Sequence, residues 1–220
     1  MNHPDRPLRF VRGVYGVTPE WDDTDRLLRA IEQAARGGMT ALQWRNKTAT
    51  GPQRQAQARA LAAGCKALGL VFIVNDSVEL ALQVDADGVH VGRDDPHPAQ
   101  ARALLGPDRL LGCSCYNQPG LAQQALQNGA DYIAFGALYP SSIKPDAVRA
   151  TTEHLRAARA LAQAWPGERR PAVVAIGGIN ALNAAPVVQA GADSIALISG
   201  LFEAPDIEAA AAACAALFQP

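Results

Sequence analysis

The chain has 220 residues, 49% of them hydrophobic, and a formal net charge of −1 at pH 7. This balance gives no electrostatic reason to expect a nucleic acid or a membrane surface as partner. No apolar run is long enough to span a bilayer, and the first ten residues lack the apolar stretch of a secretory signal. We therefore expect a cytoplasmic protein with a large core, of a length that suits one α/β barrel.

Short apolar runs alternate with longer amphipathic stretches along the whole chain. The candidate strands, in chain order, are Gly13–Thr18, Met39–Arg45, Leu70–Asp76, Gly88–Gly92, Leu110–Cys115, Tyr132–Leu138, Ala172–Gly177 and Ser194–Gly200. The clearest helical patterns between them are Asp25–Arg36, Pro52–Leu68 and Thr152–Ala164. Eight strands, each followed by a helix, predict a single (β/α)8 TIM barrel, one domain over residues 1–220.

Glycine and aspartate recur just before the strands, in Gly37–Met39, Asp85–Gly88, Gly129–Asp131 and Gly191–Asp193. Glycine at these points is typical of a chain that leaves a helix through a left-handed turn. One long connection, residues 139–151, follows the sixth strand, and long barrel loops are usually functional.

The cysteines are Cys65, Cys113, Cys115 and Cys214, and their spacing fits no zinc pattern. Cys113 and Cys115 could form a redox pair. We favour a strand that buries both thiols on its helix-facing side, because side chains alternate along a strand. Ser114 would then point into the barrel.

The second strand ends in a run of polar residues. Gln43, Arg45 and Lys47 would share one face, with Trp44 and Asn46 between them. Active sites of such barrels lie at the carboxyl ends of the strands. A guanidinium fork beside a lysine suits a diphosphate, and the alternative is a solvated basic strand end.

Two carboxylates follow neighbouring strands. Asp76 comes after Asn75 at the end of the third strand, and Asp95 follows the fourth. Carboxylate oxygens on adjacent strand ends suit Mg²⁺ held jointly with substrate phosphates. Asp76 could equally cap the next helix, and Asp94 or Asp95 could be a turn residue.

The later strands end in glycine and hydroxyl residues that suit phosphate. The loop after the sixth strand contains Ser141, Ser142, Ile143 and Lys144. Gly177 and Gly178 follow the seventh strand, and Ile198 and Ser199 end the eighth. Loops seven and eight commonly cradle phosphate in these barrels.

No acid–base pair is evident in the sequence. His90 lies on a strand, where a histidine is more often a hydrogen-bonded core residue, and His97 and His154 are no better placed for catalysis. Lys47 and Lys144 lie beyond their strands, where the desolvation that a Schiff-base lysine needs is not expected.

These motifs together resemble the thiamine-phosphate synthase family. The resemblance spans Gly13 to Gly200. It rests on the following segments, in order: Gln43-x-Arg45-x-Lys47, Asn75-Asp76, Gly88–Gly92 leading to Asp95, Gly112-x-Ser114, Phe135-Gly136 leading to Pro140–Lys144, and Ala175–Ile179.

The resemblance implies a transferase with two small-molecule substrates and Mg²⁺. A pyrimidine diphosphate would bind at Gln43, Arg45, Lys47, Asn75, Ser114 and Lys144, with Trp44 and Asn46 in the same segment. Mg²⁺ would bind at Asp76 and Asp95. A thiazole phosphate would bind at Ser141, Ser142, Ile143, Gly178, Ile198 and Ser199. Arg45, Lys47, Lys144 and Ser114 would assist departure of the diphosphate, and the barrel could form a homo-oligomer.

Three positions depart from the family pattern, namely Arg93, Ala137 and Ile143. Ile143 stands where the family usually has threonine, which leaves open a non-catalytic binder of thiazole phosphate. A thiazole tautomerase-like relative and a sugar-phosphate isomerase or aldolase are the enzyme alternatives. The first would not need the diphosphate and metal residues, and the second would need an acid–base pair or a buried lysine.

Overall fold

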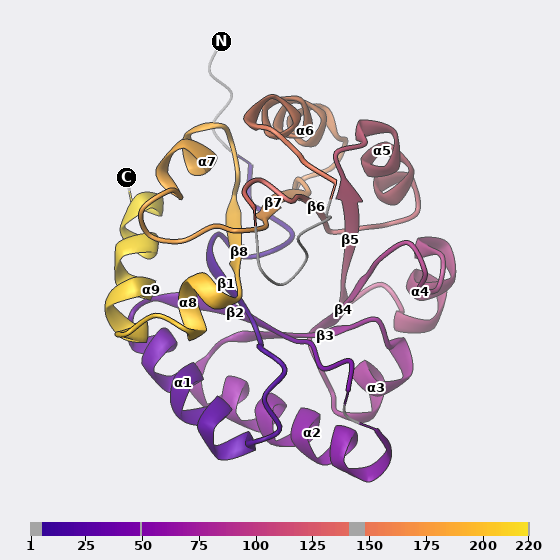
Figure 1. Cartoon of the computed structure of the whole chain (residues 1–220). Helices are drawn as coiled ribbons and strands as arrows, with labels where there is room; N and C mark the ends of the chain where they lie inside the picture. Colours follow the sequence, from indigo (N-terminus) through magenta and orange to yellow (C-terminus); the bar gives the residue numbers. More distant parts are fainter. Residues whose placement is uncertain (1–5, 49, 141–147, 220) are drawn as a thin grey trace.

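A closed barrel of parallel strands forms the centre of the molecule. The computed structural model describes residues 6–48, 50–140 and 148–219. In this part of the chain eight strands follow one another around the barrel in sequence order, and β1 pairs with β8 to close it. Helices surround the strands as an outer ring (Figure 1). The predicted (β/α)8 barrel is therefore confirmed.

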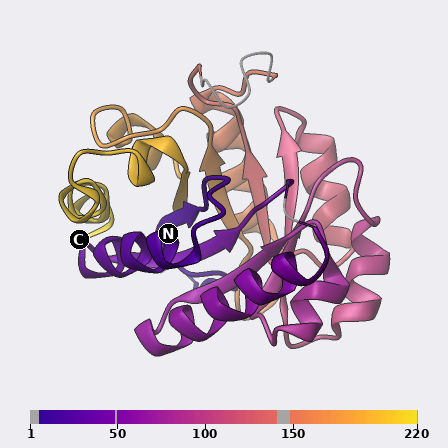
Figure 2. The ribbon, with the colours of Figure 1, turned by 60° about the horizontal axis from the view of Figure 1, so that its bottom comes forward.

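Strands and helices alternate as the hydrophobic pattern indicates, with the helices lying along the outside of the barrel (Figure 2). The strands are β1 Gly13–Val17, β2 Met39–Trp44, β3 Val71–Asn75, β4 Gly88–Val91, β5 Leu110–Tyr116, β6 Tyr132–Phe135, β7 Ala172–Ile176 and β8 Ser194–Leu197. The helices are α1 Thr24–Arg36, α2 Gly51–Leu68, α3 Val78–Gln83, α4 Pro98–Leu105, α5 Pro119–Gln127, α6 Thr152–Ala164, α7 Ala185–Gln189, α8 Ser199–Phe202 and α9 Ile207–Ala215.

The predicted strands were too long at their carboxyl ends in most cases. The sixth ends at Phe135 and the eighth at Leu197, three residues before the predicted ends. A short apolar run does not distinguish a strand from the loop or helix after it, and here Ser199 already begins α8.

The core has two layers, one inside the barrel and one between the strands and the helices. Helix α1 shows how the outer layer forms. Leu27, Ile31 and Ala34 recur at helical spacing and are fully buried, and Asp23 caps the helix by accepting from the Arg26 N–H at 2.9 Å. Inside the barrel, Phe10 stacks on Tyr132 with ring centroids 4.3 Å apart.

Aspartates at the strand starts tie neighbouring strands together. Asp87, Asp131 and Asp193 each precede an even-numbered strand, and each carboxylate accepts a backbone N–H from the strand before it. Asp193 is 1% exposed and also pairs with Arg170, which is fully buried, at 2.7 and 2.8 Å. Removal of one partner from a buried ion pair is costly in free energy, because the remaining charge is not solvated by water.

We predict that Asp193→Ala lowers the free energy of unfolding by about 3–5 kcal/mol, because it removes the carboxylate that pairs with the buried Arg170 guanidinium. Asp131→Ala is the matched control. Its partner Arg102 is 20% exposed, so the expected loss is about 1–2 kcal/mol. Urea unfolding of both variants measures the difference, and equal losses would contradict the assigned role of burial.

Candidate active site

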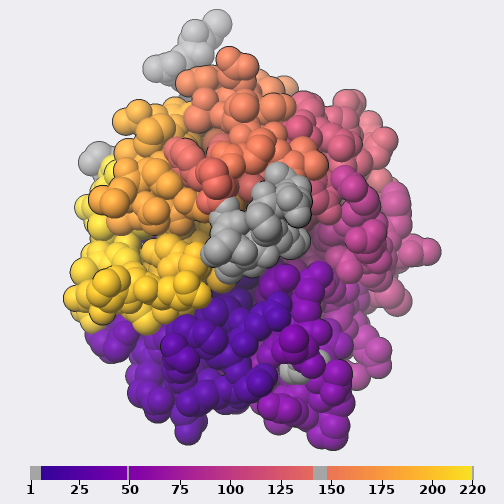
Figure 3. Space-filling view, viewed as in Figure 1, coloured from indigo at the N-terminus to yellow at the C-terminus, as the bar shows by residue number. Residues whose placement is uncertain are grey.

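A cavity of about 340 Å³ opens at the carboxyl ends of the strands. Five of the predicted site residues line it, namely Gln43, Arg45, Asn75, Ser114 and Ile198. These residues come from β2, β3, β5 and the end of β8, so the closed barrel brings together positions that are 155 residues apart in sequence. The space-filling view shows N-terminal segments of the chain in contact with the C-terminal segment (Figure 3).

The alternation of side chains along β2 decides which of its residues reach the cavity. Gln43 and Arg45 line it. Trp44 is 1% exposed and packs outward in the layer beneath the helices, where its indole N–H donates to Gln57 Oε1 at 3.0 Å. The Trp44 side chain therefore points away from the cavity, and the part that this segment plays in substrate binding stays a prediction. Asn46 also turns toward α2, since its side-chain N–H donates to Gln57 at 3.2 Å.

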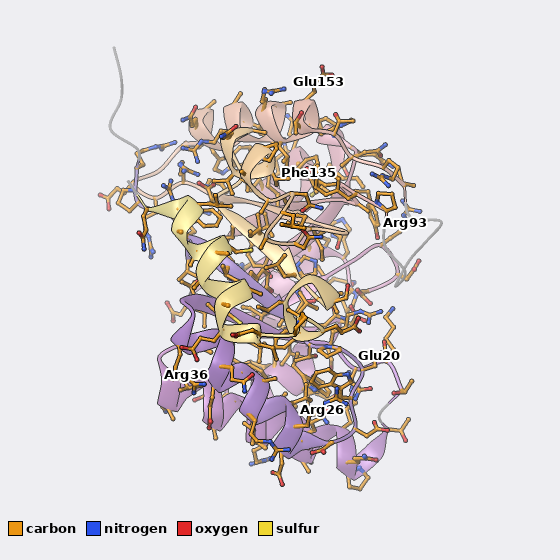
Figure 4. The ribbon with its side chains drawn as sticks, turned by 60° about the vertical axis from the view of Figure 1, so that its left-hand side comes forward. Glu20, Arg26, Arg36, Arg93, Phe135 and Glu153 are labelled. Carbon is orange, nitrogen blue, oxygen red and sulfur yellow. The ribbon has the colours of Figure 1, made fainter. Side chains whose placement is uncertain are left out.

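Arg45 is held in place by a residue that the sequence did not single out. Its Nη1 donates to Glu20 Oε1 at 2.8 Å, and its side chain is 15% exposed. The Thr18 hydroxyl accepts from the Arg45 backbone N–H at 2.8 Å. Figure 4 shows Glu20 at the same end of the barrel as Arg93, whereas Arg36 lies at the opposite end. Glu20 and Thr18 together orient the guanidinium at the cavity rim.

Asp76 and Asp95 come together at this rim. Burial raises the pKa of Asp76 to about 6, with a further increase from a hydrogen bond and the negative charge of Asp95. Lys47 and Arg45 act in the opposite direction on this pKa, so both cations are near the carboxylate pair. Two carboxylates in contact favour a shared proton or a cation between them.

The contacts of Asp76 and Asp95 distinguish between metal binding, helix capping and a turn. Ser77, and not Asp76, caps α3 by accepting from the Leu80 N–H at 3.2 Å. Asp95 does have a turn contact, because its Oδ2 accepts from the Gly92 N–H at 2.7 Å. Asp94 is exposed. The described residues contain no group of three or more potential metal ligands, so a cation here would need phosphate oxygens or water as well.

β5 separates its thiols from its hydroxyl as predicted. Cys113 and Cys115 are buried among core residues under the helices, and Ser114 lines the cavity. Burial raises the pKa of the Cys113 thiol to about 12, which disfavours the thiolate that redox chemistry needs. The redox alternative for this pair has no support in the structure.

His90 is a hydrogen-bonded interior residue that also lines the cavity. Its Nδ1 lies 3.1 Å from the Tyr132 hydroxyl, and its Nε2 lies 2.9 Å from Ser114 Oγ. Burial lowers the pKa of His90 to about 4, against a smaller opposite effect of the Asp95 charge. His97 caps α4 and His154 completes the capping box of α6, so both of these histidines have structural roles.

Two further residues lie at the rim: Tyr116, which the sequence did not single out, and Arg93, whose role the sequence did not explain. Tyr116 lines the cavity, and the guanidinium of Arg93 lies over its ring, 4.6 Å from the centroid. The Tyr116 hydroxyl accepts from the Arg93 backbone N–H at 3.2 Å. Arg93 also lines the cavity, and this stacking accounts for an arginine at that position.

The predicted residues Ser141, Ser142, Ile143 and Lys144 lie outside the described residues. Both flanks of their loop are attached to the end of β6, because the Ala137 N–H donates to the Val148 carbonyl at 2.8 Å and the Ala150 N–H donates to the Ala137 carbonyl at 3.0 Å. Val148 lines the cavity. Chain segments on both sides of the predicted residues therefore lie at the mouth.

The loops after β7 and β8 also meet this mouth. Gly177 and Ile198 line the cavity, and Ser199 begins α8. Gly178 has a φ of 62°, and a Cβ there would lie 2.8 Å from the Tyr139 carbonyl oxygen. Only glycine therefore allows the loop after β7 to approach the loop after β6 so closely.

The fold and the site define a (β/α)8 barrel enzyme, and comparisons with known proteins give its family. The family model described as thiamine monophosphate synthase matches residues 14–201. A thiamine-phosphate synthase of Bordetella pertussis is 60% identical over 213 residues, which cover 97% of this chain and 98% of that protein. One from Thiobacillus denitrificans is 50% identical over 210 residues, which cover 95% and 96%.

Similar solved structures indicate the same family and fold. A thiamine phosphate pyrophosphorylase from Pyrococcus furiosus superposes with a TM-score of 0.80 at 31% identity and 96% coverage of both chains. A 3-hexulose-6-phosphate synthase, with a TM-score of 0.65 at 16% identity, shares the fold alone. The chain belongs to the thiamine monophosphate synthase family. The predicted activity, that of a thiamine-phosphate synthase and thus of a transferase in thiamine biosynthesis, is confirmed.

We predict that the neutral state of His90 makes stability depend on pH. In the unfolded chain a histidine has a pKa of about 6.5, so between this value and pH 4 the unfolded state binds more protons and folding is disfavoured. With a folded pKa of about 4, the expected loss at pH 5 relative to pH 7.5 is about 2 kcal/mol.

Urea unfolding at both pH values tests this, with His90→Gln as the comparison. The variant should lose less stability than the wild type on going from pH 7.5 to pH 5, since its other titrating groups are the same. Identical pH dependence in the two proteins would show that His90 does not cause the effect.

Proposed function

We propose that this enzyme joins 4-amino-2-methyl-5-hydroxymethylpyrimidine diphosphate to 4-methyl-5-(2-phosphoethyl)thiazole, giving thiamine phosphate and diphosphate. The supporting observation is that Arg45 and Lys47 lie near Asp76, which is in contact with Asp95, beside a cavity of mixed polar and apolar lining. Cations and metal-binding carboxylates in contact suit a diphosphate, whereas an isomerase has no need of both.

The pyrimidine diphosphate would occupy the side of the mouth formed by β2 to β5. Gln43, Asn75 and Ser114 would hold the pyrimidine and its nearest phosphate, because all three line the cavity. Arg45 and Lys47, with Lys144 from the loop after β6, would bind the diphosphate oxygens. The Glu20 contact uses one N–H of Arg45 and leaves the others of its five free for the anion.

Asp76 and Asp95 would hold Mg²⁺. The pair fits this ion because both ligands are carboxylate oxygens and their mutual repulsion is relieved by a cation. When bound, Mg²⁺ supplies positive charge that offsets the charge of the departing diphosphate.

The thiazole phosphate would occupy the opposite side of the mouth. Ser141, the backbone of Ser142 and Ile143, Gly178, Ile198 and Ser199 would bind its phosphate, through hydroxyls and backbone N–H groups. The contact of Gly178 with the loop after β6 supports a shared site for these segments. The position of Ile198 on the cavity wall supports the same assignment.

The reaction would break the bond between the pyrimidinylmethyl carbon and the diphosphate oxygen, and the electron pair would leave with the diphosphate. The thiazole nitrogen would then donate its lone pair to that carbon. No proton is moved in either step, so no general base is required. Arg45, Lys47 and Lys144 would stabilise the leaving charge, and the cavity would hold the thiazole nitrogen close to the reacting carbon.

Two finer expectations, on location and on association, accompany this function. None of the helices in the described ranges is long and apolar enough to cross a membrane. The four cysteines are free thiols, in keeping with a reducing compartment, and we propose a cytoplasmic location. Association into a homo-oligomer stays a prediction.

Mixing the two substrates with Mg²⁺ and measuring thiamine phosphate and diphosphate tests the proposed function. Both products should appear in equal amounts. Binding of the thiazole phosphate without either product would favour a non-catalytic binder, and isomerisation of a thiazole alone would favour a tautomerase. Either result would contradict the proposal.

The lysines provide a matched test, because the chain has only Lys47, Lys66 and Lys144. Lys47→Ala and Lys144→Ala should each lower kcat/KM for the pyrimidine diphosphate by about tenfold or more, the effect of losing one charged contact to the leaving group. Lys66→Ala should leave it unchanged, since this exposed residue lies in the last turn of α2. Steady-state kinetics at saturating Mg²⁺ measures all three, and equal effects would contradict the assignment.

The aspartates provide a second test. Asp76→Asn and Asp95→Asn should raise the Mg²⁺ concentration for half-maximal activity by about tenfold or more, because each removes a charged ligand. Asp94→Asn is the control, since its side chain is exposed beside Asp95. A Mg²⁺ titration of activity distinguishes them, and an Asp94 variant as impaired as the others would contradict the assigned ligands.

A further inference from the structure

A continuous chain of hydrogen bonds crosses the interior of the barrel below the cavity. Gln43 Nε2 donates to the Tyr15 hydroxyl at 2.8 Å, and this hydroxyl lies 2.9 Å from that of Tyr132. The Tyr132 hydroxyl lies 3.1 Å from His90 Nδ1, and His90 Nε2 lies 2.9 Å from Ser114 Oγ. The two ends of the chain, Gln43 and Ser114, both line the cavity.

The middle of this hydrogen-bond chain is buried, although Tyr15 and His90 also border the cavity. Tyr15, Tyr132 and His90 are 1%, 0% and 8% exposed, and Phe10 stacks on Tyr132 from the barrel floor. Gly112 makes room for the Tyr132 ring, because a Cβ there would overlap it. Burial raises the pKa of both phenols well above the ordinary value and lowers that of His90. Near neutral pH each of the three side chains therefore contributes one proton.

Because each of these side chains has one proton to donate, the hydrogen bonds can run in one of two directions. If Gln43 donates to Tyr15, then Tyr15 donates to Tyr132, and Tyr132 donates to His90 Nδ1. The histidine proton is then on Nε2 and is donated to Ser114, whose own O–H is free. In the reverse direction Ser114 donates to Nε2, and Gln43 must accept through Oε1.

The surroundings of both ends favour the first direction. Within the described part of the chain, Gln43 Nε2 has the Tyr15 contact, no bond is found for Oε1, and no buried side-chain N or O atom lacks a partner. Oε1 is therefore open to the cavity as an acceptor. At the other end, phosphate oxygens can only accept, so a serine that binds phosphate must keep its O–H free.

We propose that Tyr15, Tyr132 and His90 are positioning residues that set the hydrogen-bonding polarity of the pyrimidine diphosphate site. They make Gln43 an acceptor and Ser114 a donor at the cavity wall. The site would then select a ligand that has an N–H donor near Gln43 and an acceptor, such as a phosphate oxygen or ring nitrogen, near Ser114. The choice of ligand rests on the proposed function, whereas the direction of the chain can be measured without it.

The direction can be read from the tautomer of His90 in the whole protein without substrate. Long-range ¹H–¹⁵N spectra of ¹⁵N-labelled protein distinguish the two neutral forms, and His90→Gln identifies the His90 signals among the four histidines. We expect the proton on Nε2. A proton on Nδ1 would mean that the hydrogen bonds run in the opposite direction, from Ser114 to Gln43. This result would overturn the proposal, whether or not the protein makes thiamine phosphate.

Two phenylalanine variants separate positioning from packing. Tyr132→Phe keeps the stacked ring but removes the donor to Nδ1, so His90 should lose its preference for the Nε2–H tautomer. Tyr15→Phe leaves Tyr132 free to donate to His90, so the tautomer should be unchanged. Each variant should raise KM for the pyrimidine diphosphate by about tenfold, the effect of one lost hydrogen bond, with a smaller change in kcat.

A purely structural role would give a different result. Both variants would then lose thermal stability while KM and the Tyr132→Phe tautomer stayed as in the wild type, and this outcome would overturn the proposal. If the wild-type protein has no synthase activity but His90 shows the expected tautomers, the proposed substrate is contradicted. The direction of the hydrogen-bond chain would still be established.

Discussion

Closure of the barrel through the β1–β8 pair is the constraint on which the rest of the structure depends. Because all strands of the described barrel run parallel, their carboxyl ends meet at one end of the molecule. Each strand of this barrel pairs with two neighbours, and the polar residues of the site lie at the strand ends and in the loops beyond them. The cavity, the Asp76–Asp95 pair and the described parts of the loops after β6, β7 and β8 all lie at this end as a result.

Charge divides this mouth into two sides. On the side of β2 to β5, Arg45 and Lys47 lie close enough to affect the titration of Asp76. On the side of β7 and β8, the described residues Gly177, Gly178, Ile198 and Ser199 have no cationic side chain. This division suits two substrates of different charge, one carrying a diphosphate with a metal ion and the other a single phosphate.

The hydrogen-bonded residues beneath the mouth are polar, and burial favours the uncharged forms of Tyr15, Tyr132 and His90 by shifting the pKa of each. The tyrosine hydroxyls, His90 and Ser114 satisfy one another, which avoids the cost of burying unpaired polar groups. A network of this kind transmits orientation and not protons, because the burial that surrounds it opposes ionisation of each member. This agrees with a substitution reaction in which no general base takes part.

The sequence by itself determined the barrel, the order of its strands and several of the residues at its mouth. Period-two and helical patterns are local properties, and the carboxyl ends of parallel strands must converge, so Gln43, Arg45, Asn75 and Ser114 could be placed in advance.

The tertiary structure alone decided the partners. Trp44 turned to Gln57, Glu20 came to hold Arg45, and Ser77 rather than Asp76 capped its helix. Tyr15, Tyr132 and His90 joined into one chain because the closed barrel brings β1, β4 and β6 within hydrogen-bonding distance. Such contacts depend on side-chain direction and burial across distant segments, which no local pattern encodes.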